Sequence, residues 1–201
     1  MILIKKIGSS EDKNINLQKI NPDVLNEICK IYSQTLPADA LPNFGSDALK
    51  KYFEYMIENK SDIIIAEKNK LYLGFLVLKY EQIDLKKIIS FKNILNFIIK
   101  SLMKPLIFIR LIFQIFRKDY APDFCSEIHA FAVKKEFSSQ GIGKMLINES
   151  EILTKNKGYK GIFTKTHNER LFKYYEKEKD INLIKKYKIL NKNYYNFYWN
   201  I

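Results

Sequence analysis

Residues 131–144, FAVKKEFSSQGIGK, join a strand-like stretch to a loop that places two glycines at the start of a helix. The first N–H groups of a helix have no intrahelical acceptor, and the helix macrodipole is positive at that end, so an anion is favoured there without a charged side chain. Gly141 and Gly143 carry no Cβ, which lets the backbone approach phosphate oxygens closely. The run predicts a diphosphate-binding loop, with an ordinary turn before a helix as the alternative reading of the run alone.

Two familiar phosphate loops are excluded, because the run has neither the third glycine of GxGxxG nor the GKS or GKT ending of a P-loop. Residues 127–175 instead resemble the GNAT superfamily of acyl-CoA N-acyltransferases. In that family a loop of pattern Arg/Gln-x-x-Gly-x-Gly/Ala, between a strand and a helix, holds the pyrophosphate of acetyl-CoA. The family's phosphate contacts are mostly backbone N–H groups, so we expect the serine that replaces Arg or Gln here to leave binding intact. The resemblance assigns acetyl-CoA binding to Ser138, Ser139, Gln140, Gly141, Ile142, Gly143 and Lys144.

A second motif follows at the distance that the family predicts. Residues 168–177, NERLFKYYEK, are similar to the family's helix pattern Asn-x-x-Ala-x-x-Leu/Phe-Tyr-x-Lys, with Asn168 and Tyr175 on its asparagine and tyrosine. Leu171 takes the alanine position, and residues 178–180 replace the usual Leu-Gly-Phe. Without the family, Asn168 is a good helix N-cap and a tyrosine on such a face is usually a packing residue. Two motifs in the family's order favour the functional interpretation.

Acyl transfer to an amine requires a base that accepts the amine's proton and an acid that protonates the departing thiolate. The resemblance implies that Tyr175 is the acid, near the coenzyme A sulfur, and that Asn168 also belongs to the cofactor site. Family members often place a carboxylate on the strand before the phosphate loop, which favours Glu127 as the base. His129 is a rival because imidazoles titrate nearer neutrality, and Asp123 is a third candidate. The alternative for each is a role outside catalysis. The carboxylates would then be charges at the rim of the site, and His129 would be a histidine of the core.

The end of this same strand has a different expected role. In the family its main-chain groups pair with the pantetheine arm of acetyl-CoA like an added β-strand. The resemblance therefore assigns Phe131, Ala132 and Val133 to the cofactor site through their backbone, and side-chain identity should matter little there.

Composition is consistent with one enzyme-sized domain over residues 1–201, since the chain can bury a sizeable core and has no linker-like stretch or repeat. The net charge of +12 suits coenzyme A, but abundant Lys, Asn, Ile and Tyr are also typical of proteins from AT-rich genomes, which is the alternative explanation of the charge. We expect no nucleic-acid partner and no metal site, because no zinc-ligand cluster or basic recognition helix is present. Cys29 and Cys125 have no redox spacing, and residues 1–14 lack a signal peptide's apolar core, so a cytoplasmic location is expected.

The elements that must position these residues can be read from apolar spacing and turn residues. Together they predict an α/β (α+β) fold, with a mixed, mostly antiparallel sheet flanked by helices, in the order of the GNAT fold. Strands are expected over residues 1–7, 63–67, 71–80, 127–133 and 161–166, helices over 22–35, 46–58 (capped by Ser46), 143–157 and 168–179, and a closing hairpin over 183–199.

Residues 90–118 are apolar and basic, and they predict a helical insertion between the third and fourth strands, with two short helices separated near Pro105. Lys100, Lys104 and Arg110 leave no run of about 20 uncharged apolar residues, so a transmembrane span is not expected. We expect the insertion to pack on the sheet beside the substrate cleft or at a dimer interface. A pair of helices on a membrane surface is the less favoured alternative, and composition does not decide between the two. A similar insertion occurs in a subset of bacterial GNAT proteins.

The sequence thus predicts an acetyl-CoA-dependent N-acetyltransferase that acts on a primary amine of a small or medium substrate by direct attack on the thioester. An amino sugar nucleotide is the first candidate acceptor. Within enzymes, the alternatives are a peptide or protein amine as acceptor, or a longer acyl group. A different class is a non-catalytic acetyl-CoA-binding module. A monomer and a homodimer both remain open.

Overall fold

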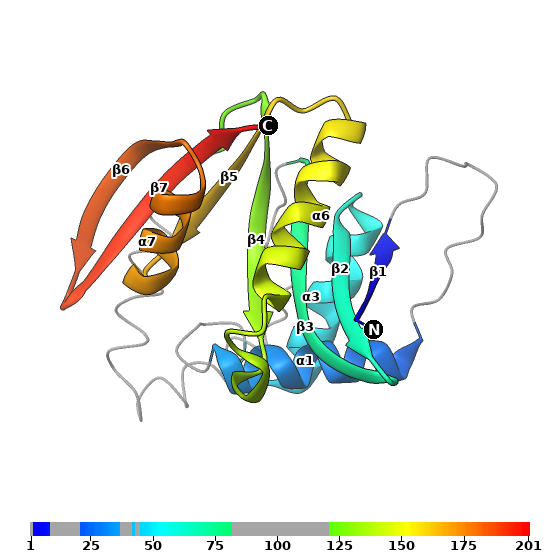
Figure 1. The fold of residues 1–201 in the computed structure, drawn as a ribbon. Coiled ribbons are helices and arrows are strands. Elements are labelled where there is room, and N and C mark those ends of the chain that lie inside the picture. The colour runs from blue at the N-terminus through cyan, green and yellow to red at the C-terminus, as the bar shows by residue number, and fades with distance from the viewer. Residues whose placement is uncertain (1, 9–20, 37–41, 43–44, 82–120) are drawn as a thin grey trace.

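The computed structural model describes residues 2–8, 21–36, 42, 45–81 and 121–201 (Figure 1). Its centre is a seven-stranded sheet in the order β1-β2-β3-β4-β5-β7-β6. The β4–β5 pair is parallel and every other neighbouring pair is antiparallel. This confirms the predicted mixed, mostly antiparallel sheet. The strands are β1 (Leu3–Gly8), β2 (Asp62–Lys68), β3 (Leu71–Lys79), β4 (Cys125–Val133), β5 (Gly161–Thr166), β6 (Ile181–Ile189) and β7 (Lys192–Asn200).

Helices cover both faces of the sheet (Figure 1). One face packs on α1 (Pro22–Thr35) and α3 (Ser46–Glu58), and the other on α6 (Ile142–Asn156) and α7 (Glu169–Glu178). The apolar run of β2 serves both layers, because alternate residues of a strand point to opposite faces. Ile63 and Ile65 accordingly lie in the core beneath α1 and α3, whereas Ile64 lies in the core beneath α6 and α7.

Two helix starts show how far cap chemistry could be predicted. α1 begins at Pro22, where the missing N–H is harmless, and the Asn21 side chain accepts a hydrogen bond from Asp23 N at 2.9 Å. The prediction that Ser46 caps α3 is wrong. Ser46 is the first helical residue, and Gly45, at φ 104°, is the N-cap with no side-chain hydrogen bond.

Strand β4 begins two residues earlier than predicted, because two polar groups satisfy each other in the core. Ser126 is fully buried, yet its hydroxyl lies 2.7 Å from that of Thr154 on α6. This pairing lets a polar residue occupy a core strand position at low cost. The predicted helical insertion at residues 90–118 lies outside the described residues. No helix in the described part is long and apolar enough to cross a membrane.

Candidate active site

The parallel strands β4 and β5 separate at the middle of the sheet (Figure 1). Their ladder runs from Cys125↔Gly161 to Ile128↔Thr164 and then stops, although β4 continues to Val133. Thr164 Oγ1 donates a hydrogen bond to the Ile128 carbonyl at 3.2 Å, at the last paired position. Beyond that point, β4 presents a strand edge towards β5 that no ladder occupies.

The predicted pantetheine-binding residues lie on this unpaired part of β4. Phe131, Ala132 and Val133 pair with β3 on one side only, at Leu76, Phe75 and Gly74 respectively. Their remaining backbone groups face the opening between β4 and β5. An extended chain with amide groups, such as pantetheine, can add to an edge of this kind as a further strand.

The predicted phosphate loop leads from β4 through the short 3-10 turn η2 (Lys135–Phe137) into α6. Gly141 is the N-cap, with a left-handed φ of 78°, and Ser139 is also left-handed at φ 66°. The first helical hydrogen bond runs from Met145 N to the Gly141 carbonyl, so the preceding N–H groups of α6 have no acceptor within the helix. The loop is exposed and can present these donors to an anion.

The polar side chains of the loop stabilise its own backbone. Ser138 Oγ donates to the Lys135 carbonyl at 2.8 Å, and Gln140 Nε2 donates to the Glu136 carbonyl at 3.4 Å. The serine that replaces the family's Arg or Gln therefore holds the η2 turn, and the helix start remains the candidate anion-binding element.

The two glycines of the loop are needed for different reasons. A Cβ on Gly141 would meet no atom within 4 Å, so its left-handed backbone is what favours glycine. A Cβ on Gly143 would lie 3.1 Å from Cζ of the Phe131 ring. The absent side chain thus lets α6 start close against β4, beside the open strand edge.

The second motif forms α7 as predicted. Asn168 is its N-cap, and Asn168 Oδ1 accepts a hydrogen bond from Leu171 N at 3.2 Å. Tyr175 is buried, with its ring 5.3 Å from that of Phe197 and 5.0 Å from that of Trp199. Burial is the main cause that raises the pKa of Tyr175, assisted by Tyr174 and Glu151. The phenol therefore remains protonated and can act as a donor.

Ion pairs join the end of α7 to α6 where the family has apolar residues. Lys179 Nζ lies 2.6 Å from Glu151 Oε1, which also accepts a hydrogen bond from Trp199 Nε1 at 2.7 Å. Glu178 lies 3.4 Å from Lys144 Nζ, at the start of α6. The altered motif ending therefore still ties α7 to the helix that carries the phosphate loop.

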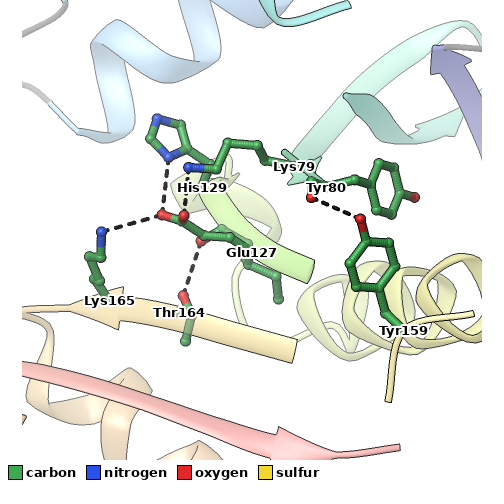
Figure 2. Close-up of polar contacts among 8 residues, drawn as sticks. Lys79, Tyr80, Glu127, His129, Tyr159, Thr164 and Lys165 are labelled. Atoms are coloured by element: carbon green, nitrogen blue, oxygen red, sulfur yellow. Dashed lines mark hydrogen bonds and ion pairs between the residues drawn. The ribbon is translucent and has the colours of Figure 1, made fainter. Parts of the chain in front are cut away.

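The predicted base, Glu127, lies at the centre of a charged cluster contributed by three strands (Figure 2). Its side chain is 6% exposed, and its carboxylate contacts Lys79 Nζ of β3 at 2.6 Å, His129 Nδ1 of β4 at 3.3 Å and Lys165 Nζ of β5 at 3.5 Å. We call these four residues the Glu127 cluster. Asp123, the third candidate base, is exposed in the turn before β4 and lies outside this cluster.

The environment of Glu127 keeps it ionised. Burial alone would raise its pKa, but the hydrogen bond and charge of His129 and the charges of Lys165 and Lys79 outweigh that effect and lower the pKa of Glu127 well below its usual range. A carboxylate that holds its proton so weakly is a poor general base, since the best catalytic bases titrate near the working pH. It is well suited to orient a neighbouring imidazole.

The depressed pKa of Glu127 predicts a pH-dependent effect on stability. Stabilisation from this carboxylate is fully present above the pKa of an unfolded glutamate and decreases as the pH falls towards the lower folded-state pKa. We expect Glu127→Gln to lower the free energy of unfolding by about 2 kcal/mol at pH 7. This is less than the usual cost of breaking a buried ion pair, because the side chains of Lys79 and Lys165 both reach solvent. Urea unfolding at pH 7 and pH 3.5 should show the difference shrinking at acid pH; an unchanged difference would contradict it.

His129 lies two residues after Glu127 on β4, so the alternation of the strand puts both side chains on the same side of the sheet. A β-bulge leaves His129 without a partner on β3. In the β3–β4 ladder Val77 pairs with Ala130 and Leu78 with Ile128, so His129 is the extra residue. Its ring lies 6.0 Å from that of Tyr52 on α3, whereas Ile128 packs in the core beneath α6 and α7. Glu127 and His129 thus lie on the α1/α3 face, whereas Tyr175 lies on the α6/α7 face.

Sequence reasoning placed Glu127 and His129 together but missed the two lysines of the cluster. Lys79 pairs directly with Glu127 across the β3–β4 ladder, and Lys165 lies one residue beyond the last β4–β5 pair. A lysine ending the apolar strand β3 was a weak signal for a buried counter-charge. No feature of the sequence indicated Lys165, since only the register of β5 brings it to Glu127.

Comparisons with known proteins agree with this geometry. The model of the Acetyltransferase (GNAT) family matches residues 25–179. No curated protein matches the chain in sequence. Many solved structures share its fold, although sequence identity to those described next is low.

Three of these structures illustrate the likeness. An IAA acetyltransferase from Bacillus cereus is 12% identical with a TM-score of 0.54, over 100% of each chain. The ribosomal-protein-S18-alanine N-acetyltransferase from Escherichia coli is 11% identical with a TM-score of 0.58, over 100% of this chain and 94% of that one. A GNAT-family acetyltransferase from Staphylococcus aureus is 13% identical with a TM-score of 0.51, over 98% of this chain and 99% of that one.

The family match covers most of the chain, and both sequence motifs lie within it. The unpaired edge of β4 and the start of α6 lie within it as well. The chain therefore belongs to the GNAT family of acetyltransferases, and acetyl-CoA is its acyl donor.

Proposed function

We propose that this protein transfers the acetyl group of acetyl-CoA to a primary amine of a small or medium molecule, with an amino sugar nucleotide as the first candidate acceptor. The observation that carries the proposal is the opening between β4 and β5, which has the phosphate loop at one end and the Glu127 cluster at its edge. This arrangement supports binding of the donor beside groups able to handle a proton. Titration with acetyl-CoA and measurement of CoA release with a panel of amines test it.

The donor is proposed to lie along the unpaired edge of β4. Backbone groups of Phe131, Ala132 and Val133 would hold the pantetheine arm, and the N–H groups at the start of α6 would hold the pyrophosphate. Residues 138–144 form that loop, and Asn168 fixes the start of the helix that carries Tyr175. The arm would then lead the thioester towards the point where β4 and β5 separate.

In the proposed reaction the amine nitrogen attacks the thioester carbonyl carbon, the carbon–sulfur bond breaks, and coenzyme A leaves as a thiolate. Glu127 was the base favoured from sequence, but its lowered pKa supports a positioning role instead. We therefore assign the base to His129, whose Nδ1 lies 3.3 Å from the Glu127 carboxylate. With Nδ1–H donated to Glu127, the other ring nitrogen can accept the amine's proton.

Tyr175, the acid predicted from sequence, is proposed to stabilise the departing thiolate by donating a hydrogen bond, because a phenol with a raised pKa donates a hydrogen bond but gives up its proton poorly. Because a thiolate is already a stable leaving group, we expect Tyr175→Phe to lower kcat by only about 10-fold, less than the usual effect of removing a general acid or base. Acetyl-CoA affinity should stay unchanged, since the ring keeps its packing against Phe197 and Trp199. Steady-state CoA release, with calorimetry for affinity, measures both. An unchanged kcat would remove Tyr175 from the reaction.

The amine panel also separates the alternatives. Turnover confined to peptides with a free N-terminus would indicate a peptide or protein acceptor, and faster turnover with longer acyl-CoA donors would indicate a different acyl group. Tight acetyl-CoA binding without release of CoA on any amine would indicate the non-catalytic binding module.

A further inference from the structure

A row of side chains leads from Glu127 across the α1/α3 face of the sheet to two aromatic rings. Glu127 pairs with Phe163 in the β4–β5 ladder, and Phe163 pairs with Tyr198 in the β5–β7 ladder. Directly paired residues of neighbouring strands project from the same face of a sheet, so the three side chains form one row. Since neighbouring strands lie about 4.8 Å apart, the row spans roughly 10 Å from Glu127 to Tyr198.

Phe124, in the turn before β4, lies at the far end of this row. Its ring packs edge-on against that of Tyr198, with 5.4 Å between the ring centroids and 82° between the planes. Phe124 Cε2 also lies 3.7 Å from the place that a Cβ of Gly161 would occupy. Gly161 precedes Phe163 by two residues on β5, so the Phe124 ring lies over the same face as the row. We call Phe124 and Tyr198 the aromatic pair.

The aromatic pair is accessible although it adjoins the core. Phe163 is 1% exposed, whereas Phe124 is 43% exposed and Tyr198 is half-buried. Among the described elements of this face, α1 packs mainly on β3 and β4, and α3 on β1 and β2, so neither helix centres on β5 or β7. A single exposed apolar side chain is ordinary. Here two rings adjoin each other, and the row that they end leads to the proposed reaction centre.

We propose that the aromatic pair belongs to the acceptor-binding site, and that the acceptor is a primary amine that carries an aromatic ring, a nucleobase or a phenyl group, roughly 10 Å from its amino group. The amino group lies beside His129, and the ring packs against Phe124 and Tyr198. This inference rests on the proposed N-acetyltransferase activity and narrows its substrate class.

The chemistry of the pair favours an aromatic ring over an aliphatic group of the same size. Aromatic rings attract one another in edge-to-face and offset-stacked arrangements, beyond the gain from burying their area. The ring of the acceptor would lie far from the atoms whose bonds change, so its contacts are the same before and during the reaction. Such contacts lower KM and leave the chemical step to the groups around the amine.

Matched pairs of acceptors test the inference by CoA release at fixed acetyl-CoA. In the first pair, 4-phenylbutylamine is compared with 4-cyclohexylbutylamine, and the phenyl compound should have a kcat/KM higher by about 2- to 10-fold. In the second, UDP-glucosamine is compared with glucosamine 1-phosphate, and stacking of the base should raise kcat/KM by about 5- to 100-fold. A preference in at least one pair is expected, and the pair that shows it identifies the kind of ring.

Variants then locate the preference. Phe124→Leu keeps an apolar side chain but removes the ring, so it should raise the KM of the aromatic acceptor and reduce the preference. Phe124→Tyr keeps the ring and should keep the preference. Leu3→Ala is the control, because Leu3 is 45% exposed, much as Phe124 is, but lies on β1 at the edge of the sheet. It should leave the preference unchanged.

The possible failures are distinguishable. Equal kcat/KM values within both pairs, or a preference that Phe124→Leu leaves unchanged, would overturn the aromatic-acceptor inference while the acetyltransferase proposal stands. Equal values together with a change in oligomeric state in Phe124→Leu would assign the aromatic pair to contact with a second copy, and would overturn the inference as well. Acetyl-CoA binding without CoA release on either pair or on the wider amine panel would overturn both proposals.

Discussion

Replacing Gly141 by tryptophan is expected to weaken acetyl-CoA binding by at least about 100-fold, because it removes two or more hydrogen bonds to charged phosphate oxygens. Gly141 is the N-cap of α6, and the space around its missing Cβ is empty to 4 Å. An indole placed there would occupy the position that the pyrophosphate needs at the helix start. Calorimetric titration of wild type and variant with acetyl-CoA measures the loss.

The matched control is at the other end of the same helix. Gly158 follows α6 with φ 80°, close to the 78° of Gly141, and it too has no atom within 4 Å of an added Cβ. Gly158→Trp therefore imposes the same left-handed strain, about 1–2 kcal/mol for a residue with a Cβ, without touching the loop. Both variants should lose similar stability, but only Gly141→Trp should lose binding. Equal loss of binding in both would show that strain, and not blocking of the phosphate site, is responsible.

Much of the fold was predictable because local signals and tertiary packing agree. Pro22 and the apolar spacing after it predicted α1 with its observed bounds, and Asn168 predicted the start of α7. Predictions were wrong where the local backbone or a local hydrogen bond outweighed the usual structural preference of a residue. Gly45, not Ser46, caps α3, and the buried hydroxyl pair of Ser126 extends β4 beyond its apolar residues.

The loop at the start of α6 was predictable in a way that the contacts of the Glu127 cluster were not. Gly141 and Gly143 lie in the short segment between the strand and the helix that it joins, so a local sequence pattern is enough to identify them. The Glu127 cluster depends on the register of β3, β4 and β5, which no local pattern specifies. Its consequence, a carboxylate with a lowered pKa, changes the role assigned to Glu127 from base to positioning residue.

His129 offers the sharpest test of that revised role. We expect His129→Gln to lower kcat by about 100- to 1,000-fold, the usual effect of removing a general base, with acetyl-CoA affinity unchanged. Gln keeps a polar side chain beside Tyr52 and Glu127 but cannot take up a proton. Initial rates of CoA release, with calorimetry for donor affinity, measure these effects.

The activity left in His129→Gln decides between the two candidate bases. If His129 is the base, Glu127→Gln should also lower kcat, by up to about 10,000-fold, because glutamine no longer stabilises the imidazolium and can hold the ring in the wrong tautomer. If Glu127 were the base, Glu127→Gln would lose as much activity as any general-base variant, whereas His129→Gln would retain most of the rate. The first outcome is the expected one, because His129 lies one residue beyond the last β4–β5 pair and its Nδ1 contacts the ionised carboxylate of Glu127 at 3.3 Å.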